Sequence, residues 1–141
     1  MNRVAREAGT MSAGTILIAD DDALMRRALR LRLDASGYRV LECGDGLAAI
    51  SKCRAQRVDA VILDHEMPLG AGRAIAGNIR RHSDAPIVFV SGHSREEFRQ
   101  IVTQYADTYF LPKPLDGSQL IDLLDSVLGE ARGRTIDHAA V

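Results

Sequence analysis

Polar side chains follow four of the short apolar runs in this sequence, each at the point where a run ends. In chain order these residues are Asp20, Asp21 and Asp22, then Asp64, then Ser91, and finally Lys113. If the runs are strands of one parallel sheet, their carboxyl ends meet at a single edge, where ligands bind in open α/β sheets. The pattern therefore predicts carboxylates, a hydroxyl and an ammonium in one site.

Carboxylates gathered in this way need a cation. Two like charges ~4 Å apart repel by roughly 1 kcal/mol in water and about 4 kcal/mol at an effective dielectric of 20. Lys113 would offset part of the negative charge, and Mg²⁺, which favours carboxylate, water and phosphoryl oxygens, would offset the rest. Asp64 is then a candidate nucleophile, because carboxylates form aspartyl phosphates. Ser91 and Lys113 would contact the phosphoryl oxygens.

The elements that must position these side chains alternate between two kinds. Apolar runs, read as strands, alternate with amphipathic segments, read as helices, and this order is typical of an α/β fold with a parallel sheet. The predicted strands are 15–19, 38–42, 60–63, 87–90 and 108–111, and the predicted helices are 24–36, 47–55, 73–82, 94–105 and 118–128. The expected fold class is a doubly wound, five-stranded parallel sheet of order 2-1-3-4-5, with helices on both faces.

The first predicted helix carries two further details. In the segment 24–36, the apolar face is assigned to residues at helical spacing, and Gly37 stands where the helix would stop; these residues are Leu24, Ala28, Leu31 and Ala35. Asp22 is interpreted as the N-cap of this helix rather than as a metal ligand.

Composition limits the classes of protein. The chain has 141 residues, of which 46% are hydrophobic and 26% charged, and this balance fits one globular domain. A formal net charge of −1 gives no basic field, so no nucleic acid partner is expected. The apolar runs are too short to span a bilayer, so no membrane association is expected.

Domain boundaries and location follow from the same inspection. Residues 1–14 and 130–141 are polar and aperiodic, so both are expected to be flexible tails around a domain at 15–129. The two cysteines, Cys43 and Cys53, have no metal or disulfide spacing, which favours reduced thiols and a cytoplasmic protein. Residues 129–141 show no pattern of an output domain, and the chain is interpreted as a stand-alone domain or, alternatively, as a piece of a larger regulator or hybrid kinase.

Four motifs together resemble the receiver domain of two-component response regulators, the CheY-like family. They are "ILIADDD", "VILDHEMPLGAG", "IVFVSGHS" and "YFLPKPL", and they span nearly all of residues 15–129. The resemblance implies a phosphoacceptor at Asp64, with Asp21 as a direct Mg²⁺ ligand and Asp20 acting through water. It also implies that the backbone carbonyl of Glu66 binds the metal and that Lys113–Pro114 is a cis peptide.

The resemblance also implies a mechanism. A histidine kinase or histidine phosphotransfer protein would supply the phosphoryl group, and the domain would catalyse both its own phosphotransfer and its autodephosphorylation. Ser91 would then move towards the phosphate, and Phe110 would turn inward. This shift would alter the face formed by the fourth helix, fifth strand and fifth helix, to which a downstream protein binds. A homodimer through the same face is left open.

Several alternatives remain open at this point. Tyr109 competes with Phe110 for the switch position. Glu66 and His93, each two residues after a site residue, are predicted to tune the lifetime of the acyl phosphate. The chain could instead be a haloacid-dehalogenase-like Mg²⁺ phosphatase with Asp64 as nucleophile, although the Asp-x-Asp-x-Thr pattern is incomplete. A third reading is a pseudo-receiver that binds partners without phosphorylation.

Overall fold

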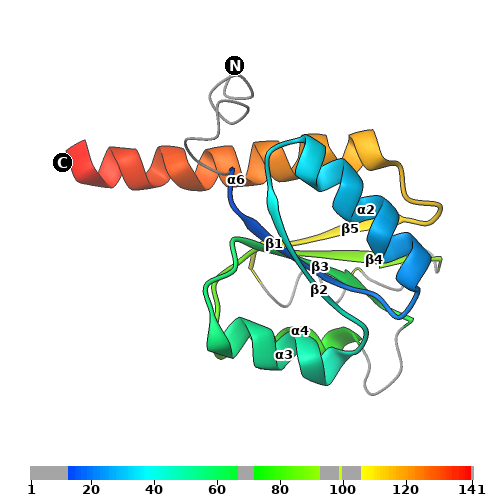
Figure 1. The fold of residues 1–141 in the computed structure, drawn as a ribbon. Helices are drawn as coiled ribbons and strands as arrows, with labels where there is room; N and C mark the ends of the chain where they lie inside the picture. The colour runs from blue at the N-terminus through cyan, green and yellow to red at the C-terminus, as the bar shows by residue number, and fades with distance from the viewer. Residues whose placement is uncertain (1–12, 67–71, 93–98, 100–105, 141) are drawn as a thin grey trace.

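The computed structural model describes residues 13–66, 72–92, 99 and 106–140. Its centre is a sheet of five parallel strands in the order β2-β1-β3-β4-β5 (Figure 1). The strands are β1 (Thr15–Ala19), β2 (Arg39–Cys43), β3 (Ala60–Asp64), β4 (Ile87–Ser91) and β5 (Thr108–Pro112). The predicted fold class and strand order are therefore confirmed, and each strand lies within one residue of its predicted range at either end.

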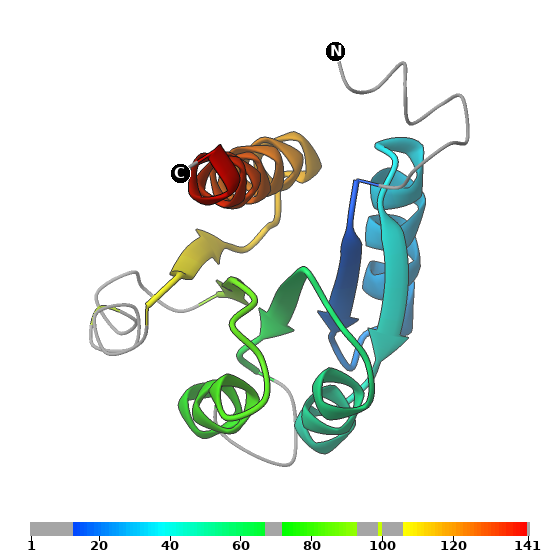
Figure 2. The same cartoon turned by 90° about the vertical axis from the view of Figure 1, so that its left-hand side faces the viewer.

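Helices cover both faces of the sheet. Helices α2 (Ala23–Ala35) and α6 (Gly117–Ala140) lie on one face, and α3 (Gly46–Ala55) and α4 (Gly72–Arg80) lie on the other (Figures 1 and 2). Every residue of β3 and β4 is buried, because both faces of these central strands are covered. The predicted helix at 94–105 lies outside the described residues, apart from Arg99.

Each face of the sheet has its own apolar core, and residues alternate between the two along each strand. Ile62 and Val88 belong to the core beneath α2 and α6. Leu63 and Phe89 belong to the core beneath α3 and α4. This alternation fixes which face of the sheet each residue near a strand end can reach.

Helix α2 begins and ends within one residue of its predicted range, but its buried face differs from the prediction. Asp22 is the N-cap and accepts hydrogen bonds from the amides of Leu24 and Met25, and Gly37 follows the helix end with a φ of 93°. However, Leu24 is 80% exposed, and the core contact is made by Leu29 and Leu33 instead. The stripe that includes Leu29 and Leu33 buries more apolar area than the predicted stripe, half of which is alanine.

Helix α2 allows a matched test of this face. Leu33→Ala should lower the free energy of unfolding by about 2–5 kcal/mol, because it empties a fully buried site. Leu31→Ala removes the same atoms from a side chain that is 63% exposed and should change stability by about 0.5 kcal/mol or less. Urea unfolding of both variants measures the difference, and the reverse order would contradict the observed face.

The C-terminal helix is longer than predicted. Helix α6 continues to Ala140, past the predicted helix end at residue 128, and the flexibility of residues 130–141 stays a prediction. Extending a formed helix costs less than nucleating a new one, and alanine and arginine recur in this stretch. Its first turns are tied to the domain, because Arg32 donates to Ser118 and Tyr38 donates to Asp125.

The N-terminal boundary is also slightly different. Ala13 is 2% exposed, and its amide donates to the carbonyl of Gly37, so packing begins before residue 15. Residues 1–12 of the predicted N-terminal tail lie outside the described residues. Among the helices that the structure describes, none combines the length and apolarity needed to cross a bilayer.

Arg80, the last residue of α4, makes hydrogen bonds to the segments before β4 and before β5 at the amino edge of the sheet. Its guanidinium donates to the carbonyls of Ser83 and Ala85 before β4, and to those of Ala106 and Asp107 before β5. Burial lowers the pKa of Arg80 from its usual value, so these carbonyl contacts stabilise a partly desolvated cation. Asp107 has a φ of 54°, and its carbonyl also accepts from the amide of Ile87.

Candidate functional site

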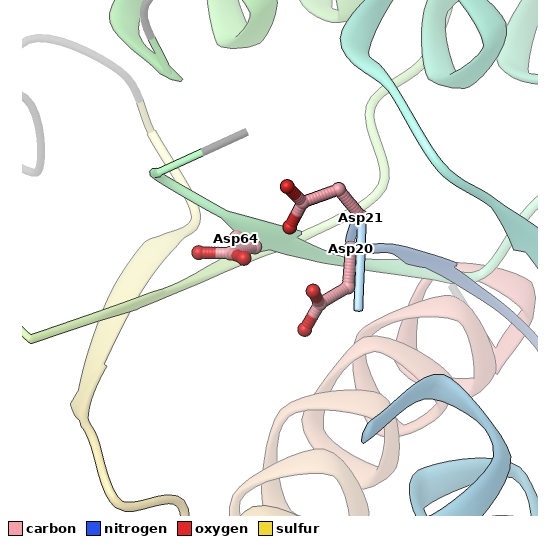
Figure 3. A group of neighbouring side chains, drawn as sticks. All are labelled: Asp20, Asp21 and Asp64. Carbon is pink, nitrogen blue, oxygen red and sulfur yellow. The ribbon is translucent and has the colours of Figure 1, made fainter. Parts of the chain in front are cut away.

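Three carboxylates meet at the carboxyl edge of the sheet. One oxygen from each of Asp20, Asp21 and Asp64 lies within 4.8 Å of the others (Figure 3). Asp64 is 4% exposed and Asp20 is 6% exposed, whereas Asp21 is open to solvent. The prediction that these three residues, far apart in sequence, come together is confirmed by the geometry.

Strand register explains this meeting. Ala19 at the end of β1 pairs with Leu63 on β3, so the next residues, Asp20 and Asp64, leave adjacent strands side by side. The amide of Asp20 donates to the carbonyl of Cys43 at 3.1 Å, which fixes the chain as it leaves β1. Asp20 Oδ1 also accepts from the amide of Asp22 at 2.8 Å. These hydrogen bonds therefore hold Asp20 in place at the end of β1.

Lys113 supplies the ammonium group that the sequence predicts at this site. Its Nζ lies 3.1 Å from Asp64 Oδ1, and the same oxygen accepts a hydrogen bond from the amide of Glu66 at 3.0 Å. The amide of Lys113 donates to the carbonyl of Ser91 at 2.8 Å, so the end of β5 is joined to the end of β4. The peptide between Lys113 and Pro114 is cis, as predicted.

The electrostatics of the site show that it is short of positive charge. Burial, followed by the charge of Asp64 and a hydrogen bond to it, raises the pKa of Asp20 to about 6, although the Asp22 amide opposes the rise. Burial lowers the pKa of Lys113, but its hydrogen bond to Asp64 and the neighbouring carboxylates outweigh this effect and raise the pKa above its usual value. A bound cation would relieve the same repulsion.

The raised pKa of Asp20 predicts how stability depends on pH. Because this pKa is about 6 in the folded protein against an ordinary 3.8, the folded state binds more protons between these values. The contribution of Asp20 to the free energy of unfolding therefore falls as the pH rises from about 4 to about 6.

Asp20→Asn, measured in chelator, should remove this contribution. Urea unfolding should show the variant to be more stable than the wild type at about pH 7, and the two to converge below about pH 3, where Asp20 is protonated in both the folded and the unfolded state. A difference that is the same at every pH would show that Asp20 does not titrate in this window.

Ser91 lies at the end of β4 and is fully buried. Its hydroxyl Oγ is 3.4 Å from Glu66 Oε1, and the amide of Gly92 donates to the same oxygen at 2.8 Å. Lys113 Nζ lies 3.9 Å from this oxygen as well. The side chain of Glu66 therefore turns into the site, and its contacts with Ser91, Gly92 and Lys113 are not evident from the sequence.

Arg26, on α2, also borders the site. Its Nη1 donates to the carbonyl of Asp20 at 2.6 Å, and its Nε is 3.3 Å from Glu42 Oε1. A hydrogen bond from Arg30, together with Arg26, holds the pKa of Glu42 below its usual value. In the sequence, Glu42 is visible as an acidic residue near the end of the second strand. Its pairing with Arg26 and Arg30 depends on which face of α2 is turned towards it, and the sequence does not give that.

The two aromatic candidates for the switch position lie on opposite faces of the sheet. Phe110 is partly buried against the core beneath α3 and α4, whereas Tyr109 packs against the core beneath α2 and α6. Phe110 pairs with Phe89, and Ser91 is two residues further along β4, so Ser91 and Phe110 share a face. His93, the other predicted modulating residue, lies outside the described residues.

The donor set fits a hard divalent cation. Three carboxylates supply oxygen ligands, which Mg²⁺ prefers, and open access at Asp21 leaves room for water. Burial, followed by the negative charge of Asp64, raises the pKa of Asp20, and a bound cation would favour the charged form of this carboxylate. Fold and site together define a flavodoxin-like α/β domain with an acidic, cation-compatible cluster at its carboxyl edge.

The chain belongs to the response regulator receiver domain family, whose sequence model matches residues 16–125. It is 31% identical over 130 residues to a probable transcriptional regulator, ycf27, of Porphyridium aerugineum, covering 92% of this chain and 52% of that protein. It is also 31% identical over 118 residues to the transcriptional regulatory protein PdtaR of Mycobacterium tuberculosis, covering 83% and 58%. The chain thus spans about half the length of these relatives.

Solved structures give the same family. A response regulator receiver protein from Sinorhizobium medicae matches with a TM-score of 0.75 and 28% identity, over 85% of this chain and 96% of that one. The receiver domain of the sensor histidine kinase PA1611 from Pseudomonas aeruginosa matches with a TM-score of 0.72 and 25% identity, over 82% and 98%. That structure has a magnesium ion coordinated in its active site cleft.

The predicted identity is therefore confirmed: this is a receiver domain of two-component signalling. The matches do not favour the haloacid-dehalogenase alternative, and neither do they favour a pseudo-receiver.

Proposed function

We propose that Asp64 accepts a phosphoryl group from the phosphohistidine of a histidine kinase or a histidine phosphotransfer protein. One observation carries the proposal: a nearly buried carboxylate at the carboxyl edge of the sheet has an ammonium at 3.1 Å and oxygens of two more carboxylates within 4.8 Å. A carboxylate in this position is both nucleophilic and surrounded by groups that bind phosphoryl oxygens.

The proposed transfer breaks one bond and makes one. A carboxylate oxygen of Asp64 attacks phosphorus, the bond from phosphorus to the histidine nitrogen breaks, and that nitrogen leaves with the electron pair. Because Oδ1 already accepts from Lys113 and from the Glu66 amide, we assign the attack to Oδ2. Lys113 and Ser91 would then contact the phosphoryl oxygens and stabilise their charge.

Mg²⁺ is proposed as the cofactor, held by Asp21 and Asp64 directly, by Asp20 through water and by the backbone carbonyl of Glu66. When bound, the ion would neutralise the phosphoryl oxygens and orient them for in-line transfer. The three carboxylates with oxygens within 4.8 Å of one another support this assignment. Asp20, Asp64 and Glu66 are also held by hydrogen bonds that involve the backbone.

Ser91 and Phe110 are proposed as the switch pair. They lie on the same sheet face of adjacent strands, so a shift of the Ser91 hydroxyl towards Asp64 would change the space into which Phe110 can turn. Tyr109 lies on the other face and cannot respond in the same way. A downstream protein would bind the face that includes β5, and homodimerisation through this face stays a prediction, as does a cytoplasmic location.

The direct test is phosphorylation in solution. Incubation with Mg²⁺ and phosphoramidate should add one phosphate by intact mass, and chelator should prevent the adduct. Hydroxylamine should remove the adduct, because it cleaves acyl phosphates and leaves serine phosphates intact, and peptide mapping should place it at Asp64. An adduct that resists hydroxylamine, or no adduct at all, would contradict the proposal.

A further inference from the structure

Three hydrogen-bond donors or cations converge on one oxygen of Glu66. The amide of Gly92 is 2.8 Å from Glu66 Oε1, the Ser91 hydroxyl is 3.4 Å away, and Lys113 Nζ is 3.9 Å away. Convergent donors of this kind form a seat for an anionic oxygen. We call this set, Ser91, Gly92 and Lys113, the oxyanion seat.

The backbone holds Glu66 close to this seat. Its amide donates to Asp64 Oδ1 at 3.0 Å, so residue 66 cannot move away from the phosphoacceptor without breaking that bond. Its side chain is nevertheless 35% exposed, so the carboxylate has an open path to solvent. Glu66 can therefore occupy the seat or leave it while the backbone stays in place.

In the proposed function, a phosphoryl group on Asp64 would bind to the same oxyanion seat. A phosphoryl group on Asp64 would place its oxygens towards Ser91 and Lys113, which are the groups that now face Glu66. Two anions cannot share one set of donors, and the carboxylate and the phosphoryl group would also repel each other. The Glu66 carboxylate therefore has to leave the oxyanion seat when a phosphoryl group binds there.

We propose that the Glu66 carboxylate is an internal competitor that occupies the oxyanion seat of the unphosphorylated protein and lowers its affinity for phosphoryl anions. This inference rests on the proposed phosphoacceptor role of Asp64. It differs from an effect on acyl phosphate lifetime, because the competition acts on the state before a phosphoryl group arrives. Glu66 is thus a residue that sets affinity at the site through the position of its side chain.

Beryllofluoride, a phosphoryl mimic that binds aspartate in the presence of Mg²⁺, provides the test. Titration calorimetry should show Glu66→Ala binding about tenfold more tightly than the wild type, since one charge-assisted hydrogen bond no longer has to be given up. Glu66→Gln should fall between the two, because its amide oxygen still accepts from Gly92 but carries no charge. Asp122→Asn removes one exposed carboxylate from α6 and should match the wild type.

The beryllofluoride titration distinguishes a failure of the proposed Glu66 competition from a failure of the proposed phosphoacceptor function. If wild type and both Glu66 variants all fail to bind, the phosphoacceptor role and the competition are both overturned. If all bind equally, or the variants bind more weakly, only the competition is overturned.

The amide of Gly92 gives a second readout in intact protein. Before titration, its proton chemical shift should differ between the wild type and Glu66→Ala, and it should exchange faster in the variant. With beryllofluoride bound, the two spectra should converge at Gly92, because the same ligand then fills the seat in both. Shifts that are alike before titration, or that stay apart afterwards, would contradict the proposal.

Discussion

Asp64→Asn is expected to reduce the acyl phosphate adduct to background under conditions in which the wild type is fully labelled. The variant keeps the shape of the side chain but replaces a carboxylate with an amide, whose oxygen is a poor nucleophile and carries no charge for a cation. Intact mass after incubation with Mg²⁺ and phosphoramidate measures the loss. Removing one of three crowded carboxylates should also raise the midpoint of thermal unfolding in chelator.

Asp22→Asn is the matched control for this experiment. It removes a carboxylate from the same acidic run, but Asp22 serves as the N-cap of α2, and asparagine caps helices equally well. The control should therefore be labelled like the wild type. An adduct on Asp64→Asn that hydroxylamine still removes would move the phosphoacceptor to another carboxylate.

Lys113→Ala is expected to slow phosphorylation from phosphoramidate by about 10²–10³-fold, the usual cost of losing one preorganised charge at a reacting oxygen. The variant takes away the ammonium that lies 3.1 Å from Asp64 and leaves this carboxylate beside Asp20 without its described counter-ion. The backbone bond from residue 113 to the Ser91 carbonyl does not involve the side chain, so the link between β5 and β4 should persist.

Lys52→Ala provides the comparison, because Lys52 on α3 is the only other lysine in the sequence. Its labelling rate should equal that of the wild type. Lys113→Arg should recover only part of the lost rate, since a planar guanidinium does not reproduce the compact charge of an ammonium. If Lys113→Ala is labelled within about tenfold of the wild-type rate, then Lys113 does not act on the transfer in the way proposed here.

The positions of the main site residues are predictable because each follows an apolar run. A strand covered on both faces must be apolar throughout, so the first polar residue marks its end, and in a parallel sheet all ends of one kind share an edge. Asp20, Asp64 and Lys113 are found by this local rule alone. The cis peptide at Pro114 and the metal ligand roles are implied only by resemblance to the family.

Other features depend on contacts that no local pattern encodes. Helix α2 has two apolar stripes, and the choice between Leu31 and Leu33 is settled by how much area each buries against the sheet. The inward turn of Glu66 is possible only because Gly92 and Lys113, from two other segments, offer it donors. The length of α6 reflects the low cost of extending a helix that the domain has already nucleated.

Arg80 has a consequence for where the domain can change shape. Its guanidinium donates hydrogen bonds to carbonyl groups before β4 and before β5. A neutral side chain has too few donors to satisfy these acceptors at once. The upstream end of β5 is therefore anchored at the side of the sheet opposite Asp64. If the domain is phosphorylated as proposed, we expect this end of β5 to stay in place and any rearrangement of the strand to be larger towards Lys113.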